Sequence, residues 1–275
     1  MMHHSIGAIK RLELTVEGSH TAGLEEMRPY ADLLATAHGP FKDGKDGEIR
    51  LNSAATDGDF REESIKIIEN FIDMTEAFPQ LTQINLHFGG VRRFEPEQTH
   101  GREGEYNLQV EAFQRIADFA AKRDKEIVLE NSVAAWGGVS NDTPYDQVDW
   151  SEQNLNFGTD PEEWIRICEE VDRPNVGLCL DTSHACTYSH RFPEGQRPDI
   201  LFSFLQRPEM VRHVHWSDNY LYDVRGRFDS HEILGRGTEP VEFHREIKGL
   251  DAIILLETAC TVEELQEQLG FINKL

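Results

Sequence analysis

Residues 176–184 read VGLCLDTSH, an apolar run that ends abruptly in two polar side chains, Asp181 and His184. A short run of this kind is typical of a buried strand, and the polar residues mark the point where the strand stops. Similar runs recur along the chain, so this stretch gives the pattern from which the fold can be predicted.

Seven such segments alternate with amphipathic stretches, and no linker rich in Pro, Gly and Ser marks a domain boundary. We expect strands at Arg11 to Val16, Leu33 to Ala37, Gln83 to His87, Glu126 to Glu130, Val176 to Asp181, Val211 to His215 and Ala252 to Glu257. We expect helices at about 23–32, 62–77, 107–123, 160–171, 197–207, 240–247 and 261–272.

The alternation of strands and helices predicts right-handed crossovers and a parallel sheet. We therefore expect an α/β fold in which residues 1–275 form a single parallel (β/α) TIM-type barrel domain. Seven strands are clear, so the first of the usual eight is either missing or supplied irregularly by the Ser5 to Ile9 run.

The composition is that of an ordinary globular protein, with 39% hydrophobic and 9% aromatic residues. No stretch approaches the ~18 to 20 apolar residues that cross a bilayer, and the N-terminal residues have no signal-peptide core. We therefore expect a cytoplasmic protein without a membrane partner. The four cysteines have neither a CxxC nor a zinc-knuckle spacing and are expected to be free thiols.

The formal net charge of −23 repels nucleic-acid phosphates at long range, which disfavours duplex DNA as a partner. The same carboxylates could simply hydrate the surface in a salty cytoplasm, where screening weakens that repulsion. A small phosphorylated or carbohydrate substrate fits the charge better.

Potential metal ligands stand where six of the seven strands stop. In a parallel barrel these positions converge on one mouth, where barrel enzymes place their active sites. Alternation along the strands supports this direction, because Glu130 shares a face with Val128, and Glu257 shares one with Leu255. The six residues are His38, His87, Glu130, Asp181, His215 and Glu257.

Three further ligands lie on nearby loops: His184 in DTSH, and Asp229 with His231 in FDSHEILGRG. Imidazole combined with carboxylate suits zinc, manganese or iron, and nine ligands exceed what one ion can use. We expect two or three divalent ions and no organic cofactor.

Each of these residues also has an ordinary structural explanation when taken alone. A strand-end histidine is more often a hydrogen-bonded core residue than a ligand, and Asp or Thr frequently caps a helix. The recurrence at six strand ends favours a metal site. Trp136 and Trp216 could wall a substrate pocket or pack in the core.

The remaining histidines are interpreted differently. His213 is expected to pack one layer below His215, and the others are interpreted as solvated. These are His3, His4, His20, His100, His190 and His244.

The motifs AHGPF with RLNS downstream, LHFGG, LEN, GLCLDTSHA, HWSDN, DSHEILGRG and LLET resemble the xylose isomerase-like barrel superfamily over about residues 33–260. Within it the chain most resembles the endonuclease IV-like branch, which binds three divalent ions through nine ligands. The resemblance implies ligand roles for all nine residues named above. Its sugar isomerase and epimerase relatives use one metal, at residues matching Glu130, Asp181, His215 and Glu257.

The chain departs from the DNA-repair members of that branch in several motifs. The DNA-repair members resemble a pattern with DTCH, HLND and D-R-H, whereas this chain has DTSH, HWSD and D-S-H. Its LEN motif is followed by SVAAWGG instead of a Thr-Ala-Gly run. These differences concern DNA specificity and leave the metal ligands complete.

Two functions follow from these features. In a multi-metal phosphoesterase, clustered ions would activate water and Glu130 or Glu257 would bridge them. Candidate phosphate contacts are Arg92, Arg93, Arg225, Arg227 and Arg236.

In a sugar or sugar-phosphate isomerase or epimerase, one metal would polarise a carbonyl while Glu130 and Glu257 move a proton through an enediol. The sequence places the phosphoesterase slightly ahead, because four ligands, His38, His87, Asp229 and His231, have no duty in the one-metal reaction.

Overall fold

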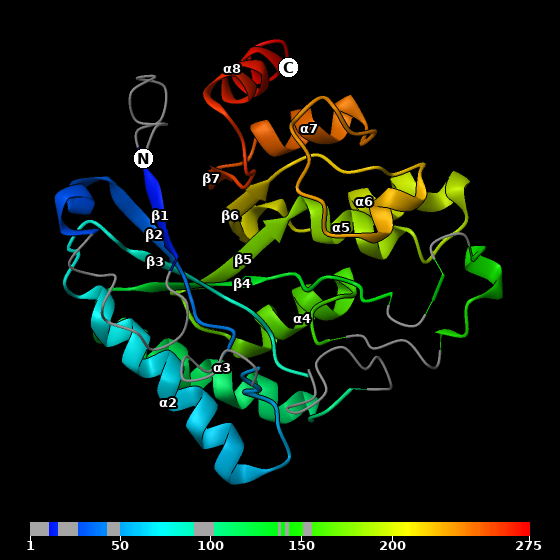
Figure 1. Ribbon diagram of the computed structural model, residues 1–275. Helices are drawn as coiled ribbons and strands as arrows, with labels where there is room; N and C mark the ends of the chain where they lie inside the picture. Colours follow the sequence, from blue (N-terminus) through cyan, green and yellow to red (C-terminus); the bar gives the residue numbers. More distant parts are fainter. Residues whose placement is uncertain are drawn as a thin grey trace.

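The computed structural model describes residues 11–15, 27–42, 50–90, 102–136, 139–140, 143–150 and 156–275. Seven strands form one sheet that curls into a nearly closed barrel (Figure 1). They are β1 (Leu12–Thr15), β2 (Leu34–His38), β3 (Gln83–Leu86), β4 (Glu126–Glu130), β5 (Val176–Asp181), β6 (Val211–Trp216) and β7 (Ile253–Leu256).

The strands follow one another in chain order and every neighbouring pair is parallel. The predicted fold class and the seven expected strands are confirmed, each within two residues of its predicted bounds. The described residues contain no ladder between β7 and β1, where the eighth strand of a full barrel would lie. The Ser5 to Ile9 run lies outside the described residues.

Helices connect the strands on the outside of the sheet. The α-helices are α2 (Gly58–Thr75), α3 (Tyr106–Ala121), α4 (Pro161–Val171), α5 (Thr182–Ser189), α6 (Arg197–Ser203), α7 (Val241–Lys248) and α8 (Val262–Ile272). The short 3₁₀ helices are η3 (Arg28–Leu33), η4 (Tyr145–Gln147), η6 (Glu194–Gln196), η7 (Pro208–Met210) and η8 (Val224–Arg227).

Helix predictions were less accurate than strand predictions. The described part of the helix expected at 23–32 is largely the 3₁₀ helix η3, in which Pro29 occupies the first turn. Helix α5 was not predicted, because its sequence TSHACTYS is buried along its whole length and shows no amphipathic period.

Local capping explains where several helices begin. The Asp57 side chain accepts the backbone N–H groups of residues 59 and 60 at the start of α2, and Asp160 does the same for α4, where Pro161 follows. Thr261 and Glu264 form a reciprocal capping box at the start of α8. These caps fix the connections between helices and strands.

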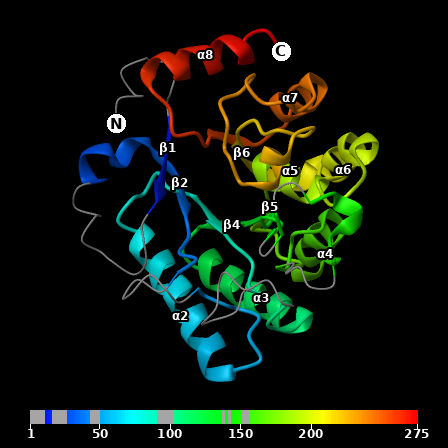
Figure 2. The same cartoon turned by 45° about the vertical axis from the view of Figure 1, so that its right-hand side comes forward.

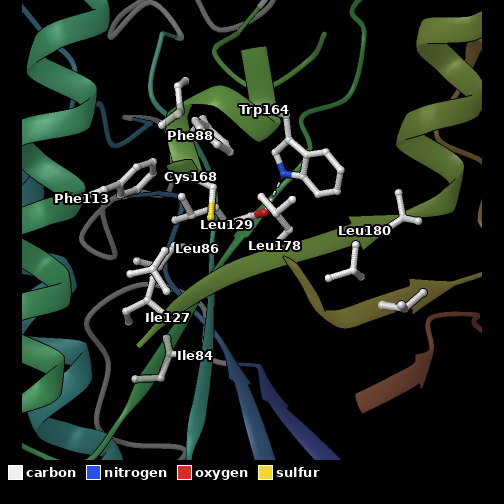
Figure 3. Packing of buried hydrophobic residues seen from close by; sticks show 14 of the residues in the cluster. Ile84, Leu86, Phe88, Phe113, Ile127, Leu129, Trp164, Cys168, Leu178 and Leu180 are labelled. Carbon is white, nitrogen blue, oxygen red and sulfur yellow. Dashed lines mark hydrogen bonds between the residues drawn. The ribbon is translucent and has the colours of Figure 1, made fainter. Parts of the chain in front are cut away.

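The two faces of the sheet differ in chemistry. Outward side chains such as Ile84, Leu129 and Leu178 pack against Phe113 and Trp164 of the surrounding helices (Figure 3). The Trp164 indole N–H also donates to the carbonyl oxygen of Leu129 at 2.8 Å. Alternate residues of the same strands point into the barrel, and the buried ones are mainly polar. The apolar core therefore lies between sheet and helices, and the barrel interior is left for chemistry.

Helices α2, α3 and α4 lie side by side along one flank of the sheet in both views (Figures 1 and 2). None of the described helices combines the length and the apolar character that a membrane span requires. All four cysteines are free, as the sequence predicts.

Candidate metal centre

The nine predicted ligands gather at the C-terminal mouth of the barrel, eight of them in three adjoining groups and Glu257 beside His215. Atoms within each of three groups lie within 4.8 Å of one another: His38, His87 and Glu130; Glu130, Asp181 and His215; and Asp181, His184, Asp229 and His231. Glu130 and Asp181 each belong to two groups, so the three form one continuous cluster.

The central set consists of Glu130, Asp181, His215 and Glu257. Nδ1 of His215 lies 3.6 Å from Glu130 Oε1 and 2.9 Å from Glu257 Oε2. It also lies 3.9 Å from Asp181 Oδ2, so one imidazole nitrogen faces three carboxylates. Glu257 follows directly after β7, and its backbone N–H donates to the carbonyl oxygen of Trp216.

The turn from β5 into α5 places two ligands together. Asp181 is the N-cap of α5, and its Oδ1 accepts the backbone N–H of His184 at 2.8 Å. Its Oδ2 stays directed to the cluster, 3.9 Å from Nε2 of His184. Asp181 therefore serves as both helix cap and candidate ligand, and DTSH determines both roles.

The first flanking set joins β2, β3 and β4. Nε2 of His38 and Nε2 of His87 are 3.0 Å apart, and each lies near Oε2 of Glu130, at 3.7 and 3.4 Å. The amide of Asn85 donates to the same carboxylate oxygen. Two imidazole nitrogens and one carboxylate oxygen thus lie close enough together to bind one ion.

The second flanking set joins α5 to the loop after β6. Asp229 lies between two histidines, 3.2 Å from His184 Nε2 and 2.7 Å from His231 Nε2. Nδ1 of His184 contacts the carbonyl oxygen of Asn131 at 2.8 Å, which fixes the ring orientation. His231 has φ +41°, a left-handed conformation that is rare for a residue with a side chain and recurs at functional sites.

Glu13 on β1 is a functional candidate that the sequence did not reveal. Its carboxylate is buried inside the barrel, 3.2 Å from His213 Nε2 and 3.3 Å from His215 Nε2, and it accepts a hydrogen bond from the Thr36 hydroxyl. The signal was present, because Glu13 is a charged residue between Leu12 and Leu14 in the first strand. His213 lies one layer below His215, as expected.

Burial and charge pairing compete at the centre of the cluster. Burial acts to raise the pKa of the Glu130 carboxyl, but the imidazoles of His87 and His215 hold this pKa well below its usual range. Burial lowers the pKa of His87 to about 4, against the attraction of Glu130. For His215, burial acts to lower the pKa, and nearby acidic groups raise it well above its usual range.

The pKa values of Asp181 and His231, which both lie beside Asp229, are raised. Burial raises the pKa of Asp181 to about 7, although His184 and His231 oppose the shift. Burial acts to lower the pKa of His231, but the adjacent carboxylates of Asp229 and Asp181 raise it to about 9. Protons on these groups compensate the buried carboxylates.

The donor set fits a divalent cation. Four buried atoms, His215 Nδ1 and Nε2, His231 Nε2 and Glu257 Oε2, have no hydrogen bond of acceptable geometry among the described residues, although oppositely charged atoms are close. A cation would neutralise such a cluster of carboxylates and use the imidazole nitrogens as ligands. Nitrogen and carboxylate oxygen donors suit zinc, manganese or iron.

A cavity of about 240 Å³ opens on the cluster. Its walls come from the loops after β2, β3, β4 and β6, and three candidate ligands, His87, His184 and Asp229, line it. The volume lies slightly below the ~300 Å³ that begins the usual range for ligand pockets, so it suits a small molecule.

The tryptophans predicted near the substrate do not line this cavity. Trp216 is 2% exposed and donates its indole N–H to Nδ1 of His244, so core packing is the better interpretation for it. Trp136 is half-buried and stacks under the guanidinium of Arg227, 4.3 Å from the ring centroid. Phe41 and Phe88 are the aromatic residues of the cavity wall.

The predicted phosphate contacts are engaged elsewhere in the described part of the chain. Arg225 pairs with Asp223, and Arg236 pairs with Glu264 and Glu267 of α8. Arg227 donates to the carbonyl oxygen of Thr143 at 2.6 Å. Arg92 and Arg93 lie outside the described residues.

The prediction that His190 and His244 are solvated was wrong, because each is 1% exposed. His190 contacts the carbonyl oxygen of Tyr220, and His244 accepts the indole N–H of Trp216. The sequence placed them in a loop and on a helix but did not reveal which face is covered. His3, His4, His20 and His100 lie outside the described residues.

Comparison with curated proteins finds two relatives of low identity. An uncharacterised protein of Methanocaldococcus jannaschii is 25% identical over 95% of this chain and 81% of its own length. A probable endonuclease 4 of Mycoplasma mobile is 24% identical over 39% of this chain, and the match spans 40% of that relative.

Solved structures with the same fold include a D-tagatose 3-epimerase-like protein, with a TM-score of 0.68, 20% identity and coverage of 100% of this chain and 93% of that one. A xylose isomerase domain protein from Planctomyces limnophilus has a TM-score of 0.60, 17% identity and coverage of 95% and 86%. A D-psicose 3-epimerase, solved in the presence of D-fructose, has a TM-score of 0.57, 15% identity and coverage of 94% and 87%.

The family model described as xylose isomerase-like TIM barrel matches residues 21–275, so the chain belongs to this family of enzymes.

Proposed function

We propose that the protein is a divalent-metal-dependent sugar isomerase or epimerase whose metal is held by Glu130, Asp181, His215 and Glu257. The observation that carries the proposal is the central set, in which one nitrogen of His215 faces three carboxylates within 3.9 Å. The bound metal would act as a Lewis acid on a substrate carbonyl and its neighbouring hydroxyl.

Two glutamates are positioned to move a proton. Glu130 and Glu257 contact His215 Nδ1 from β4 and from the end of β7, so a substrate bound there would lie near both carboxylates. One would take the proton from the carbon beside the carbonyl, and the other would return a proton to the enediol. The Asn85 amide holds the Glu130 carboxylate in place.

The cavity and the comparisons support a small carbohydrate as substrate. The cavity of about 240 Å³ suits a small molecule, and the net charge of −23 is unfavourable for DNA. Similar folds include epimerases of free sugars, one of them solved with D-fructose. These observations place the isomerase or epimerase ahead of the phosphoesterase, which reverses the order suggested by the sequence.

The test is Glu257→Gln, which nearly conserves volume and removes the negative charge. We expect turnover in a panel of ketoses and aldoses, assayed with Mn²⁺ by chromatography, to fall at least ~10²-fold, the lower range for losing a general base. Glu242→Gln, on an exposed side chain of α7, is the matched control and should keep full turnover. An unaltered rate in Glu257→Gln would exclude this residue from the mechanism.

A multi-metal phosphoesterase is the second candidate, and the completeness of both flanking sets favours it. His38, His87, Asp229 and His231 have no assigned duty in a one-metal isomerization, yet the structure brings all four to the cluster. Turnover of an abasic-site duplex with no turnover of any sugar would select this function instead.

A further inference from the structure

We propose that Arg50 forms an anion-binding subsite of the cavity, so that the substrate carries a phosphate or carboxylate group in addition to its reacting carbons. The proposal deepens the proposed function by naming a substrate class, and it rests on that function. Arg50 follows the loop after β2, and its backbone forms an isolated antiparallel bridge with Lys42.

The Arg50 side chain shares the cavity with candidate metal ligands. It lines the same space as His87, His184 and Asp229, and it is half-buried. Burial lowers the pKa of its guanidinium, and no acid among the described residues offsets this effect. An anion bound at this position would lie beside the metal centre.

Arg50 differs from the other partly buried arginines of the described chain, because no described residue gives its guanidinium a hydrogen bond, ion pair or ring contact. Arg197 and Arg227, in contrast, donate to the carbonyl oxygens of Leu221 and Thr143. Removing a guanidinium from water without a partner costs free energy, and a bound anion offsets that cost.

The described walls of the cavity offer no free anion for Arg50. Asp229 is the one carboxylate among its described lining residues, and it already contacts His184 at 3.2 Å and His231 at 2.7 Å. The guanidinium fork matches the oxygens of a phosphate or a carboxylate in bidentate fashion. A ligand anion is therefore the partner that suits this side chain.

The other walls suit the carbon chain and hydroxyl groups of a small polyol. Phe41 is 39% exposed and lies 5.2 Å from the ring of His87, so it can cover an apolar face of a sugar. Asn156 lines the cavity, and its buried Oδ1, an acceptor, has no hydrogen-bond partner among the described residues. Sugar phosphates and sugar acids share the required chemistry.

The test compares matched ligands on the Mn²⁺-loaded protein by titration calorimetry. The probes are D-fructose, D-fructose 6-phosphate, D-glucuronate and inorganic phosphate, and D-glucose is the neutral control for the sugar acid. Because a hydrogen bond to a charged group contributes a factor of about 10 to 100 in affinity, we expect at least one anionic sugar to bind about 10-fold or more tightly than its neutral counterpart. A larger preference for D-fructose 6-phosphate over D-fructose would identify phosphate as the substrate's anionic group. A larger preference for D-glucuronate over D-glucose would identify carboxylate.

Arg50→Gln should reduce that preference to within about 2-fold and leave D-fructose affinity and metal content unchanged, because only the ion pair is removed. Arg245→Gln, an exposed arginine of α7 that pairs with Glu242, is the matched control and should retain the preference. Thermal unfolding of both variants checks that the fold is intact, and Arg50→Lys should recover part of the preference.

Two results would overturn the subsite: equal binding of neutral and anionic sugars by the parent protein, or an undiminished preference in Arg50→Gln. The second result would assign the anion to the metal instead. Failure of the proposed function has a different signature. A preference for anionic sugars that depends on Arg50, without turnover of any sugar, would support the subsite and reject the isomerase. Turnover of neutral sugars without that preference would support the isomerase and reject the subsite.

Discussion

Glu13 on β1 and His215 on β6 meet inside the barrel, with Glu13 Oε1 3.3 Å from His215 Nε2. The other ring nitrogen, Nδ1, faces the carboxylates of Glu130 and Glu257. A metal-ligating histidine usually donates its second N–H to a carboxylate or carbonyl, which fixes its tautomer and orientation. The Glu13 carboxylate lies close enough to Nε2 of His215 to take this role once the ring N–H is aligned with it.

We therefore expect Glu13→Gln to weaken Mn²⁺ binding by about 10- to 100-fold, the usual effect of losing such a partner. A fluorescent chelator competition at pH 7.5 measures this affinity. Glu111→Gln on the exposed face of α3 serves as the control. Unchanged affinity in Glu13→Gln would mean that His215 is oriented by other contacts.

His231→Ala separates the two candidate functions. In the proposed isomerase the central set holds the metal without His231, so metal content per chain should stay constant and the main change should be weaker substrate binding. In a multi-metal phosphoesterase the variant should lose about one ion and phosphodiester turnover should fall. Metal analysis by mass spectrometry combined with both assays gives the answer, and loss of an ion together with duplex cleavage would reject our proposal.

Metal affinity should increase with pH. The pKa of His231 is raised to about 9 and that of Asp181 to about 7, so both groups are largely protonated at pH 6. A metal bound near them must displace these protons, and their loss at higher pH removes the competition. Calorimetric titration of Zn²⁺ at pH 6, 7 and 8, in buffers of different ionization enthalpy, should show tighter binding and fewer released protons as pH rises. Identical affinity at all three values would contradict this expectation.

Glu239 is a buried carboxyl whose two oxygens have no hydrogen-bond partner among the described residues. Burial raises its pKa well above the usual range, and the nearby charges of Asp218 and Asp181 act in the same direction. The neutral acid is thus favoured in the folded state. The contribution of Glu239 to the free energy of unfolding is therefore fully present below the unfolded-state pKa near 4.5, and it is lost as pH rises through the folded-state pKa.

Glu239→Gln removes this ionization. We expect it to raise Tm by roughly 2 to 4 °C at pH 8, the shift for about 1 kcal/mol in a chain of this size, and by less at pH 5.5. Differential scanning calorimetry measures both values, with the exposed Glu246→Gln as control. A lower Tm in the variant at pH 8 would show that the Glu239 carboxylate is stabilising.

The strands and the convergence of the nine candidate ligands were predictable from sequence, because both depend on local patterns. A continuous apolar run predicts a buried strand such as β5. Because the strands are parallel, their polar C-terminal ends lie at the same mouth of the barrel. The nine candidate ligands could therefore be named from residue type and position, although their division into sets could not. The bounds of β4 and β5 were predicted to the residue, whereas α5 was missed because a helix buried on all sides has no amphipathic period.

Two further residues of the site depend on contacts between segments far apart in the chain. Glu13 can be recognised as part of the site only in the folded chain, where β1 faces His213 and His215 on β6. His213 lies 200 residues after Glu13 in the sequence. Arg50 is one of many arginines until the fold half-buries it in the cavity that His87 also lines, where no described residue pairs with it. Local pattern thus determined the barrel and its ligand types, while tertiary structure decided which charges are paired, because burial and pairing are properties of the whole packed chain.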